Sequence, residues 1–457
     1  MSFKFINSKC LFSANKLTFT IFSLIDMRIH TISIQNFRGY KDLTTTLNPK
    51  FNLIIGDNGS GKTAFLEALT IAIGSFFLGI RGVYSRGFYK NDIHIATHEH
   101  NEEYLYPVIV EATGSINNIE LIWKRTLNGA TNRTTQKEAD SIKNCALQID
   151  SQVRSGETVN LPLLIYYATG RLFDVARDTE EFEKGSKEKQ PISSRFRAYH
   201  KSLEAKSTHK QFQKWFKGKE LSKIQKGVND ISFELVKNTI ISNLPNCESI
   251  FYEFDPDKPQ GLKIEFTDGR ILPFNSLSDG TRNFFAILAD MAYKCITLNP
   301  HLKDKALIET EGVVLIDELD LHLHPDWQRK IINVLKNTFP NIQFIATTHS
   351  PFLIQETGQD QLILLKNNTI DKITSANNLS IEDIAEDLQY VDNPQWSKSR
   401  QRMFEKASKY YKAVKEGTDN QEMKNELDEA MKPFAIDTAF YAIVEQEKLI
   451  AKFKNKS

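Results

Sequence analysis

The chain has 457 residues, of which 40% are hydrophobic and 25% charged, and its formal net charge at pH 7 is +1. This composition is typical of a globular chain of about three domains, and the small net charge excludes a protein that binds polyanions over its whole surface. No run approaches the ~20 apolar residues that a membrane span requires. The four cysteines have no paired spacing, which argues against a disulfide framework or zinc site and favours the cytoplasm.

Residues 1–26 differ from the sequence that follows. They contain the apolar run Leu17–Ile25 but no small-x-small cleavage site, which disfavours a signal peptide. We expect a non-native or disordered extension, with Met27 as the true start. Alternating apolar and polar residues then predict strands at Arg28–Phe37 and Leu43–Leu47.

A glycine-rich loop lies between an apolar strand and an apolar helix at Phe51–Thr63, FNLIIGDNGSGKT. It matches GxxxxGK[ST] completely, which argues against a turn that binds nothing. Glycines let backbone N–H groups turn toward a phosphate, Lys62 can reach the β- and γ-phosphates, and the Thr63 hydroxyl can ligate Mg2+. The sequence therefore predicts a nucleoside triphosphate site at Gly56, Asn58, Gly59, Ser60, Gly61, Lys62 and Thr63.

The next elements are less regular. In order, we expect a hairpin of Tyr106–Val110 and Ile119–Trp123 around Gly114, a helix at Thr135–Val153 and an apolar strand at Leu161–Tyr167. Three histidines, His94, His98 and His100, precede this hairpin and lie near carboxylates. A metal site is one interpretation, but their spacing fits no known ligand pattern well, which favours a polar loop.

Between residues 184 and 226, Lys and Arg strongly outnumber Asp and Glu. Aromatic residues recur there at helical spacing: Phe196 with Tyr199, and Phe212 with Trp215 and Phe216. The favoured interpretation is a helical insertion whose aromatic side chains pack on the body and whose lysines are solvated. The alternative is a basic platform for DNA, RNA or an acidic partner.

A second phosphate-binding motif follows three short strands, which we expect at Phe251–Phe254, Leu262–Phe266 and Ile271–Phe274. The sequence LSDGT, ending at Thr281, precedes an apolar helix and resembles the LSGGQ signature of ABC-type ATPases. A Ser-x-Gly turn at a helix N-terminus suits a phosphate, so Ser278 and Gly280 are candidate contacts.

The remaining motifs lie near the ends of two apolar strands. Gly312–Glu318, GVVLIDE, has the Walker B pattern, in which Asp317 would hold Mg2+ and Glu318 would polarise the attacking water. Asp320 matches the D-loop, and His349 follows the second strand where ABC-type ATPases carry a switch histidine. Since all these motifs occur in the expected order, we expect the P-loop and Walker B strands to be neighbours in one sheet.

Longer stretches of the sequence narrow the resemblance to one group of ABC-type ATPases. Five stretches resemble bacterial stand-alone ABC-type ATPases: NFRGY, YATGR, LSDGTRN, IDELDLHLHPDWQ and FPNIQFIATTHSPFLI. These ATPases are grouped with the RecF and SMC heads and are often called ATP-binding proteins involved in virulence. The ATPase subunit of Septu anti-phage systems, which works beside an HNH nuclease, is among the nearest relatives. The resemblance covers most of residues 27–365. It implies that His322 and His324 belong to the extended Walker B motif rather than to a catalytic zinc site.

The resemblance also implies an architecture. It predicts an α/β ABC-type P-loop ATPase head with a mixed sheet, an antiparallel β subdomain, a helical insertion and a helical C-terminal region. The expected segments are an extension (1–26), an N-terminal lobe with the P-loop (27–170), a basic helical insertion (171–245), a C-terminal lobe with the signature, Walker B and switch histidine (246–365), and a helical C-terminal region (366–457). The signature departs from the family at Asp279 and Thr281, which puts transporter-like turnover in doubt.

Two functions are consistent with this resemblance. The first is an ATP-hydrolysing, Mg2+-dependent switch that forms a homodimer or higher even oligomer and controls an effector, such as an HNH or other nuclease, in anti-phage defence. The family's signature residues, matched here by Ser278 and Gly280, close over the γ-phosphate held by a second subunit. The alternative is a DNA-repair or DNA-end-binding ATPase resembling RecF. The C-terminal hundred residues contain no HNH motif and no convincing Toprim-type metal cluster.

Overall fold

The computed structural model describes most of the chain. It covers residues 27–98, 101–172, 195–204, 209–227, 229–371, 376, 379–418 and 421–434. The expected extension 1–26, His100 and parts of the basic segment lie outside the described residues. The five segment boundaries drawn from the sequence stay predictions.

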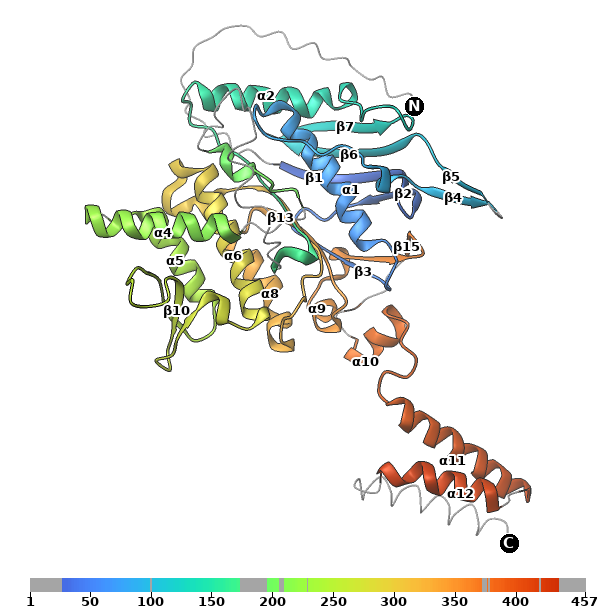
Figure 1. Ribbon diagram of the computed structural model, residues 1–457. Helices are drawn as coiled ribbons and strands as arrows, with labels where there is room; N and C mark the ends of the chain where they lie inside the picture. Colours follow the sequence, from blue (N-terminus) through green and yellow to red (C-terminus); the bar gives the residue numbers. More distant parts are fainter. Residues whose placement is uncertain are drawn as a thin grey trace.

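A six-stranded sheet runs through the centre of the molecule (Figure 1). Its order is β15 (Thr369–Asp371), β14 (Leu362–Lys366), β3 (Phe51–Ile55), β13 (Ile342–Thr347), β12 (Gly312–Ile316) and β8 (Leu163–Tyr167). All neighbours are parallel except β15, which is antiparallel to β14. Every residue of β3, β8, β12 and β13 is buried, which explains why these strands are continuous apolar runs in the sequence.

The P-loop and Walker B strands are not neighbours, so that expectation is wrong. Strand β13 lies between β3 and β12 and pairs with both. The consecutive strands β12 and β13 are joined by the crossover helix α8 (Pro325–Thr338), and this connection makes them adjacent. The strand that precedes His349 therefore occupies the middle of the site.

A second, antiparallel sheet lies on the other side of helix α1 (Lys62–Gly74) (Figure 1). Its order is β2 (Tyr40–Thr46), β1 (Met27–Phe37), β6 (Val108–Ile116) and β7 (Ile119–Leu127). Helix α1 contacts strands of both sheets, and Trp123 Nε1 donates a hydrogen bond to Ala72 O at 2.9 Å. Residues 62–79 have the length and hydropathy of a membrane span, but 78% of this window is buried in the protein, as in a core helix.

The hairpin of β6 and β7 turns at Asn117 and Asn118, with φ of 55° and 59°, and not around Gly114 as the sequence suggested. Two consecutive left-handed residues are typical of a tight hairpin turn, and asparagine tolerates that conformation. Gly114 lies inside β6, where a Cβ atom would be 2.1 Å from Arg28 O. This glycine is required by close strand packing and not by a turn.

The helical insertion packs on the body through its aromatic residues, as the favoured interpretation predicts. It comprises α4 (His209–Lys226) and α5 (Ile231–Asn243), followed by a three-stranded sheet of β9 (Cys247–Glu253), β10 (Gly261–Phe266) and β11 (Ile271–Pro273). Phe212 and Phe216 are buried, and Trp215 contacts Tyr293 of helix α6 (Asp279–Leu298) at a ring distance of 5.1 Å. Lys219 and Lys223 form ion pairs with Asp230 and Glu234.

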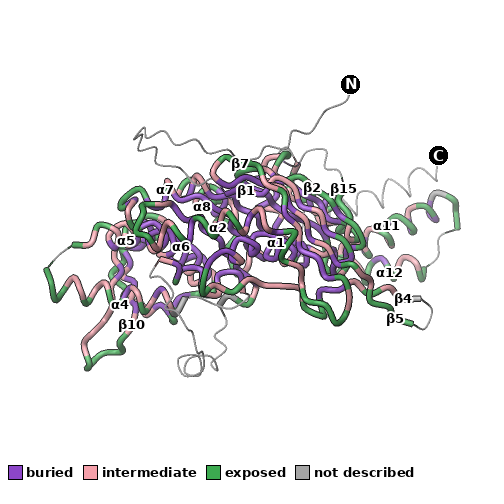
Figure 2. The backbone as a smooth tube through the Cα atoms, turned by 90° about the horizontal axis from the view of Figure 1, so that it is seen from above, coloured by how far each residue is buried: buried purple, intermediate pink, exposed green. Residues whose placement is uncertain are grey.

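The other described elements lie outside these three sheets. They are α2 (Asp140–Arg154), β4 (Ile95–His98), β5 (Asn101–Tyr104), α7 (Ala306–Glu309), α9 (Pro351–Gln355), α10 (Ile381–Asp383), α11 (Lys398–Glu416) and α12 (Gln421–Met431). Buried residues concentrate around the sheets and α1 (Figure 2). Helices α11 and α12 form a hairpin with a small core of its own, which includes Met403, Tyr410 and Leu427. The predicted α/β fold with a mixed sheet, an antiparallel subdomain and helical additions is confirmed.

Candidate active site

The P-loop connects the end of β3 to the start of α1. Gly56, Gly59 and Gly61 all have positive φ, at 146°, 82° and 97°. A Cβ atom on Gly56 would lie 2.2 Å from Leu365 O, and Gly61 is the left-handed N-cap of α1. These backbone conformations favour glycine, and they give the loop the concave shape that holds an anion.

The polar side chains of this loop fit a phosphate ligand. Lys62 is 7% exposed, and its Nζ donates to the carbonyl oxygens of Gly56 and Asp57 at 2.8 and 2.9 Å. Burial lowers the pKa of Lys62 from its usual value, and the carboxylate of Asp317 opposes that shift. The Ser60 hydroxyl is buried without a hydrogen-bond partner among the described residues. A buried hydroxyl inside a glycine loop is a group that a bound phosphate would satisfy.

A hydroxyl and a carboxylate meet where α1 approaches the end of β12. Thr63 Oγ1 donates to Asp317 Oδ2 at 2.9 Å, although 254 positions separate the two residues. Asp317 is 1% exposed. Oxygen ligands of this kind suit Mg2+, which a nucleotide phosphate would complete. No group of three His, Cys, Asp or Glu side chains with metal-site geometry occurs in the part of the chain that the structure describes, and of the three histidines singled out in the sequence only the side chain of His94 belongs to that part.

Glu318 follows Asp317 in an unusual backbone conformation, with φ of 48°. A left-handed conformation is uncommon outside glycine and clusters at functional sites. The backbone N–H of Glu318 donates to Thr347 Oγ1 at 2.7 Å. The same threonine hydroxyl donates to Asp317 Oδ1 at 2.6 Å. The two acids of the Walker B motif therefore share one hydroxyl from the adjacent strand.

His349 lies beside the P-loop lysine. Its pKa is lowered from the usual value by burial and by the charge of Lys62, while Asp320 and Glu318 oppose this shift. A lowered pKa keeps the imidazole neutral at pH 7. The His349 carbonyl accepts a hydrogen bond from Gln389 Nε2 at 2.7 Å, which connects this loop to the segment after α10.

Asp320 contacts the loop that carries His349. Its Oδ1 accepts from Thr348 Oγ1 at 2.6 Å and from the His349 backbone N–H at 3.4 Å. The D-loop candidate is thus attached to the switch-histidine loop within the same chain. The structure brings together the P-loop, Asp317, Glu318, Asp320 and His349.

The signature residues lie in a different part of the site. Ser278 is the N-cap of α6, where its Oγ accepts from the Thr281 backbone N–H at 3.4 Å. A Cβ atom on Gly280 would lie 2.2 Å from His322 O, so this glycine lets α6 approach the loop after Walker B. Asn283 Nδ2 also donates to Leu321 O in that loop, at 2.8 Å.

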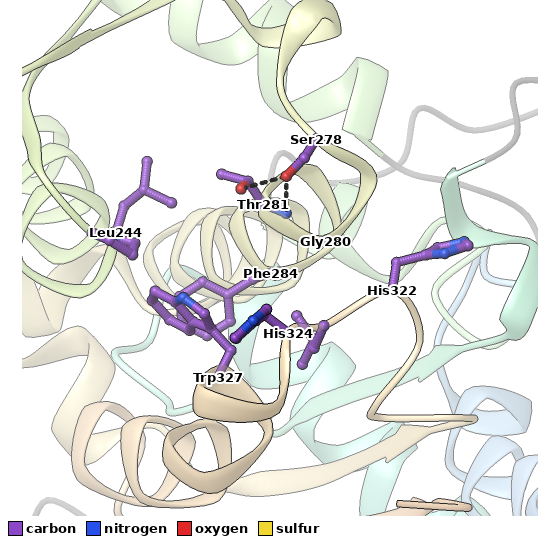
Figure 3. A pocket seen from close by; sticks show the side chains of 10 residues that line it. Leu244, Ser278, Gly280, Thr281, Phe284, His322, His324 and Trp327 are labelled. Atoms are coloured by element: carbon purple, nitrogen blue, oxygen red, sulfur yellow. Dashed lines mark hydrogen bonds between the residues drawn. The ribbon is translucent and has the colours of Figure 1, made fainter. Parts of the chain in front are cut away.

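A cavity of about 180 Å³ opens beside the signature (Figure 3). It is lined by residues from the signature, the loop after Walker B, α8 and the end of α5: Ser278, Gly280, Thr281, Phe284, His322, Leu323, His324, Trp327, Leu244 and Pro245. No P-loop residue lines it. The side chains of His322 and His324 point in different directions in Figure 3, which does not suit a shared metal ion.

Sequence reasoning missed four residues that contact the site: Thr347, Thr348, Tyr40 and Gln389. A signal existed for the two threonines, since consecutive hydroxyls at the end of a fully buried, mostly apolar strand are unexpected. No local pattern marks Tyr40, whose hydroxyl donates to Gly61 O at 2.9 Å, or Gln389.

A protein-family model described as "AAA domain, putative AbiEii toxin, Type IV TA system" matches residues 51–355, which include every motif of the site. The chain belongs to this family. The chain is therefore an ATPase of the AAA-domain family, and both the resemblance to stand-alone ABC-type ATPases and the predicted ATP hydrolysis are confirmed. The role of each individual residue stays a prediction.

Proteins similar to this AAA-domain ATPase include retron and Septu proteins. "Retron Ec83 probable ATPase" of Escherichia coli is 29% identical over 409 residues, covering 75% of this chain and 72% of that protein. "Septu protein PtuA" of Bacillus thuringiensis is 56% identical over 55 residues, covering 12% and 14%. Among solved structures, the SMC head domain from Thermotoga maritima is 14% identical, covers 76% of this chain and 99% of that one, and has a TM-score of 0.41.

Proposed function

We propose that two copies of this ATPase close around two Mg2+-ATP molecules and thereby switch a partner effector in anti-phage defence. One observation supports the proposed dimer. The P-loop, Walker B and switch-histidine residues converge within one chain, whereas Ser278 and Gly280 line a separate cavity that no P-loop residue reaches. A signature placed in this way needs the nucleotide of a second copy.

Each residue then has a defined role. Bound Mg2+-ATP supplies the phosphoryl group and the cation that offsets its charge. Lys62 exchanges its two loop carbonyls for phosphate oxygens, and Thr63 with Asp317 holds the cation. Glu318 accepts a proton from the attacking water, as a general base does. His349 is kept neutral and can donate a hydrogen bond to the phosphoryl group.

The signature of one copy would complete the site of the other. The N-terminus of α6 carries a partial positive charge, and Ser278 adds a hydroxyl at that end. An ATP molecule that has engaged Lys62 and Mg2+ still carries negative charge, which this helix end can stabilise. ATP would therefore be part of the interface between the two copies.

The effector role rests on the relatives. Two of them are named retron ATPases, and others are named Septu protein PtuA. The Septu ATPase that the motifs resemble works beside an HNH nuclease, and we infer a protein effector of that kind here. We expect the products of neighbouring genes to co-purify with this ATPase in a manner that depends on ATP. Stimulation of the isolated ATPase by DNA, without any co-purifying protein, would favour the repair function instead.

The dimer has a direct test. We expect specific ATPase activity to fall as the protein is diluted, and the mass measured with ATP to be twice that of the monomer or a higher even multiple. Measurements on the Glu318→Gln variant, which should retain ATP, would make the ATP-dependent mass easier to observe. A monomer that stays fully active at nanomolar concentration would refute the shared site.

A further inference from the structure

Thr347 contacts three consecutive residues of the Walker B segment. Its hydroxyl donates to Asp317 Oδ1 at 2.6 Å and accepts from the Glu318 backbone N–H at 2.7 Å. Its carbonyl oxygen accepts from the Leu319 backbone N–H at 2.8 Å. Thr347 is fully buried at the end of β13, between the P-loop strand and the Walker B strand. One residue of the central strand thus holds the turn in which both acids lie.

The direction of these hydrogen bonds is fixed by the groups involved. An amide N–H can only donate, so the hydroxyl oxygen of Thr347 must accept from Glu318. The hydroxyl proton is then available for the carboxylate of Asp317, which as an anion can only accept. A bond to a charged acceptor inside a buried site is stronger and more directional than one between neutral groups.

Each contact has a consequence for one of the acids. Because Oδ1 of Asp317 is engaged by Thr347, Oδ2 is turned toward Thr63, at 2.9 Å, where the cation would bind. Glu318 has φ of 48°, a conformation that persists only where neighbouring groups hold it. The Thr347 hydroxyl and carbonyl accept from the backbone N–H of Glu318 and of the following residue, and so hold the backbone from which the Glu318 side chain projects.

We propose that Thr347 is a positioning residue for ATP hydrolysis, whose single hydroxyl orients the cation ligand Asp317 and the general base Glu318 together. This inference rests on the roles assigned to these two acids under the proposed function. Thr347 is fully buried and its hydroxyl is engaged by Asp317 and Glu318, so it would act through these two acids. Its removal therefore affects turnover and the cation requirement, and leaves the P-loop able to bind ATP.

Two substitutions separate the hydroxyl from the bulk of the side chain. Thr347→Val keeps the shape and removes the hydroxyl, whereas Thr347→Ser keeps the hydroxyl and removes a methyl group. For Thr347→Val we expect kcat to fall roughly 100-fold, since small displacements of catalytic groups have effects of this size. We expect the Mg2+ concentration for half-maximal activity to rise roughly 10-fold, as for loss of a group that orients a metal ligand. Thr347→Ser should restore both quantities to within about threefold of wild type.

Matched measurements distinguish positioning from a loss of folding. ATP affinity measured by calorimetry in EDTA should be the same in wild type and Thr347→Val, because Lys62 and the glycine loop are untouched. Thr357→Val removes a buried threonine hydroxyl that donates to Leu353 O and contacts neither acid, and should leave the Mg2+ requirement at the wild-type value. The proposal is wrong if Thr347→Val matches wild type in kcat and Mg2+ requirement, if it loses ATP affinity in EDTA, or if Thr347→Ser is as defective as Thr347→Val.

The assigned role of Glu318 is tested in parallel. Glu318→Gln should stall hydrolysis whatever Thr347 does. If Glu318→Gln hydrolyses ATP normally, the proposed roles of the acids fail and the Thr347 inference fails with them. If Glu318→Gln is inactive and Thr347→Val is normal, only the positioning role fails.

Discussion

The two halves of the proposed nucleotide site differ in how completely one chain builds them. In the P-loop half, Thr63 and Asp317 are already 2.9 Å apart, and Lys62 is held by loop carbonyls. In the signature half, Ser278 caps its own helix and Gly280 packs against the loop after Walker B, beside an open cavity. The comparison teaches that one chain brings the P-loop and the Walker B acids together but leaves the signature in a separate place. Substitutions in the two halves should therefore differ in their effects on ATP binding and on ATP hydrolysis.

The largest effects are expected in the P-loop half. Glu318→Gln removes the carboxylate that accepts the proton of the attacking water, and we expect kcat to fall about 100-fold or more while ATP binding persists. Lys62→Ala removes the cation that faces the phosphates, and should impair binding itself. Calorimetry with ATP and a steady-state phosphate assay measure the two effects. Equal losses of ATP affinity in both variants would contradict these assignments.

Ser278→Arg tests the signature half. The added bulk at the N-terminus of α6 should leave ATP affinity near wild type, because no P-loop residue contacts this position. Hydrolysis and the ATP-dependent increase in mass should both be lost. Mixing Ser278→Arg with Lys62→Ala should restore partial activity, because one shared site then has an intact P-loop opposite an intact signature.

Mass measurement of Ser278→Arg with ATP provides the control for that mixing experiment, since rescue also requires that one competent site works alone. If Ser278→Arg forms the ATP-dependent dimer and hydrolyses ATP at the wild-type rate, the signature has no part in a shared site. If it loses ATP affinity as a monomer, the two halves are not separate.

A smaller effect is expected at Gly280, where the signature packs against the loop after Walker B. Gly280→Ala would place a Cβ atom 2.2 Å from His322 O, and the backbone must shift to avoid it. Overpacking of this kind costs about 1–3 kcal/mol of unfolding free energy. Gly218→Ala is the matched control, because a Cβ atom on Gly218 in helix α4 meets nothing within 4 Å and alanine favours a helix by about 1 kcal/mol. Denaturant unfolding should show opposite signs for the two variants; equal signs would contradict this packing account.

The smallest effect concerns pH. The pKa of His349 in the folded protein lies below its ordinary value of 6.5, so below that pH the unfolded chain binds a proton that the folded protein does not. Stability contributed by the neutral imidazole is present above pH 6.5 and falls as the pH drops below it. Between pH 7.5 and pH 5.5, the Tm of the wild-type protein should therefore fall further than the Tm of His349→Gln. Parallel pH profiles for the two proteins would show that His349 does not titrate in this way.

The sequence predicted the chemistry of the site better than its arrangement. Glycine, Lys62 and Thr63 must follow one another within a few residues to bind a phosphate, so a local pattern was sufficient. The position of β13 between β3 and β12 depends on how crossover helices order a sheet, which no local pattern encodes. Thr347 was missed for the same reason, because its contacts to Asp317 and Glu318 cross from one strand to the next.

The prediction of the antiparallel sheet shows the same limit at a smaller scale. Gly114 suggested a turn because glycine is common in turns, but here it allows β6 to lie close to Arg28. The asparagine pair at 117 and 118 was the better turn signal. In both regions, residue type indicated what a position can do, and packing decided which of those options was used.

The hydrogen bond from Gln389 to the His349 carbonyl connects the C-terminal region to the loop that carries His349. Gln389 follows α10 and precedes α11, so the segment that leads to the α11–α12 hairpin is attached to the loop that carries the switch-histidine candidate. A change in the conformation of the His349 loop would therefore act on the segment before α11 through this bond, and that segment would act on the loop in return.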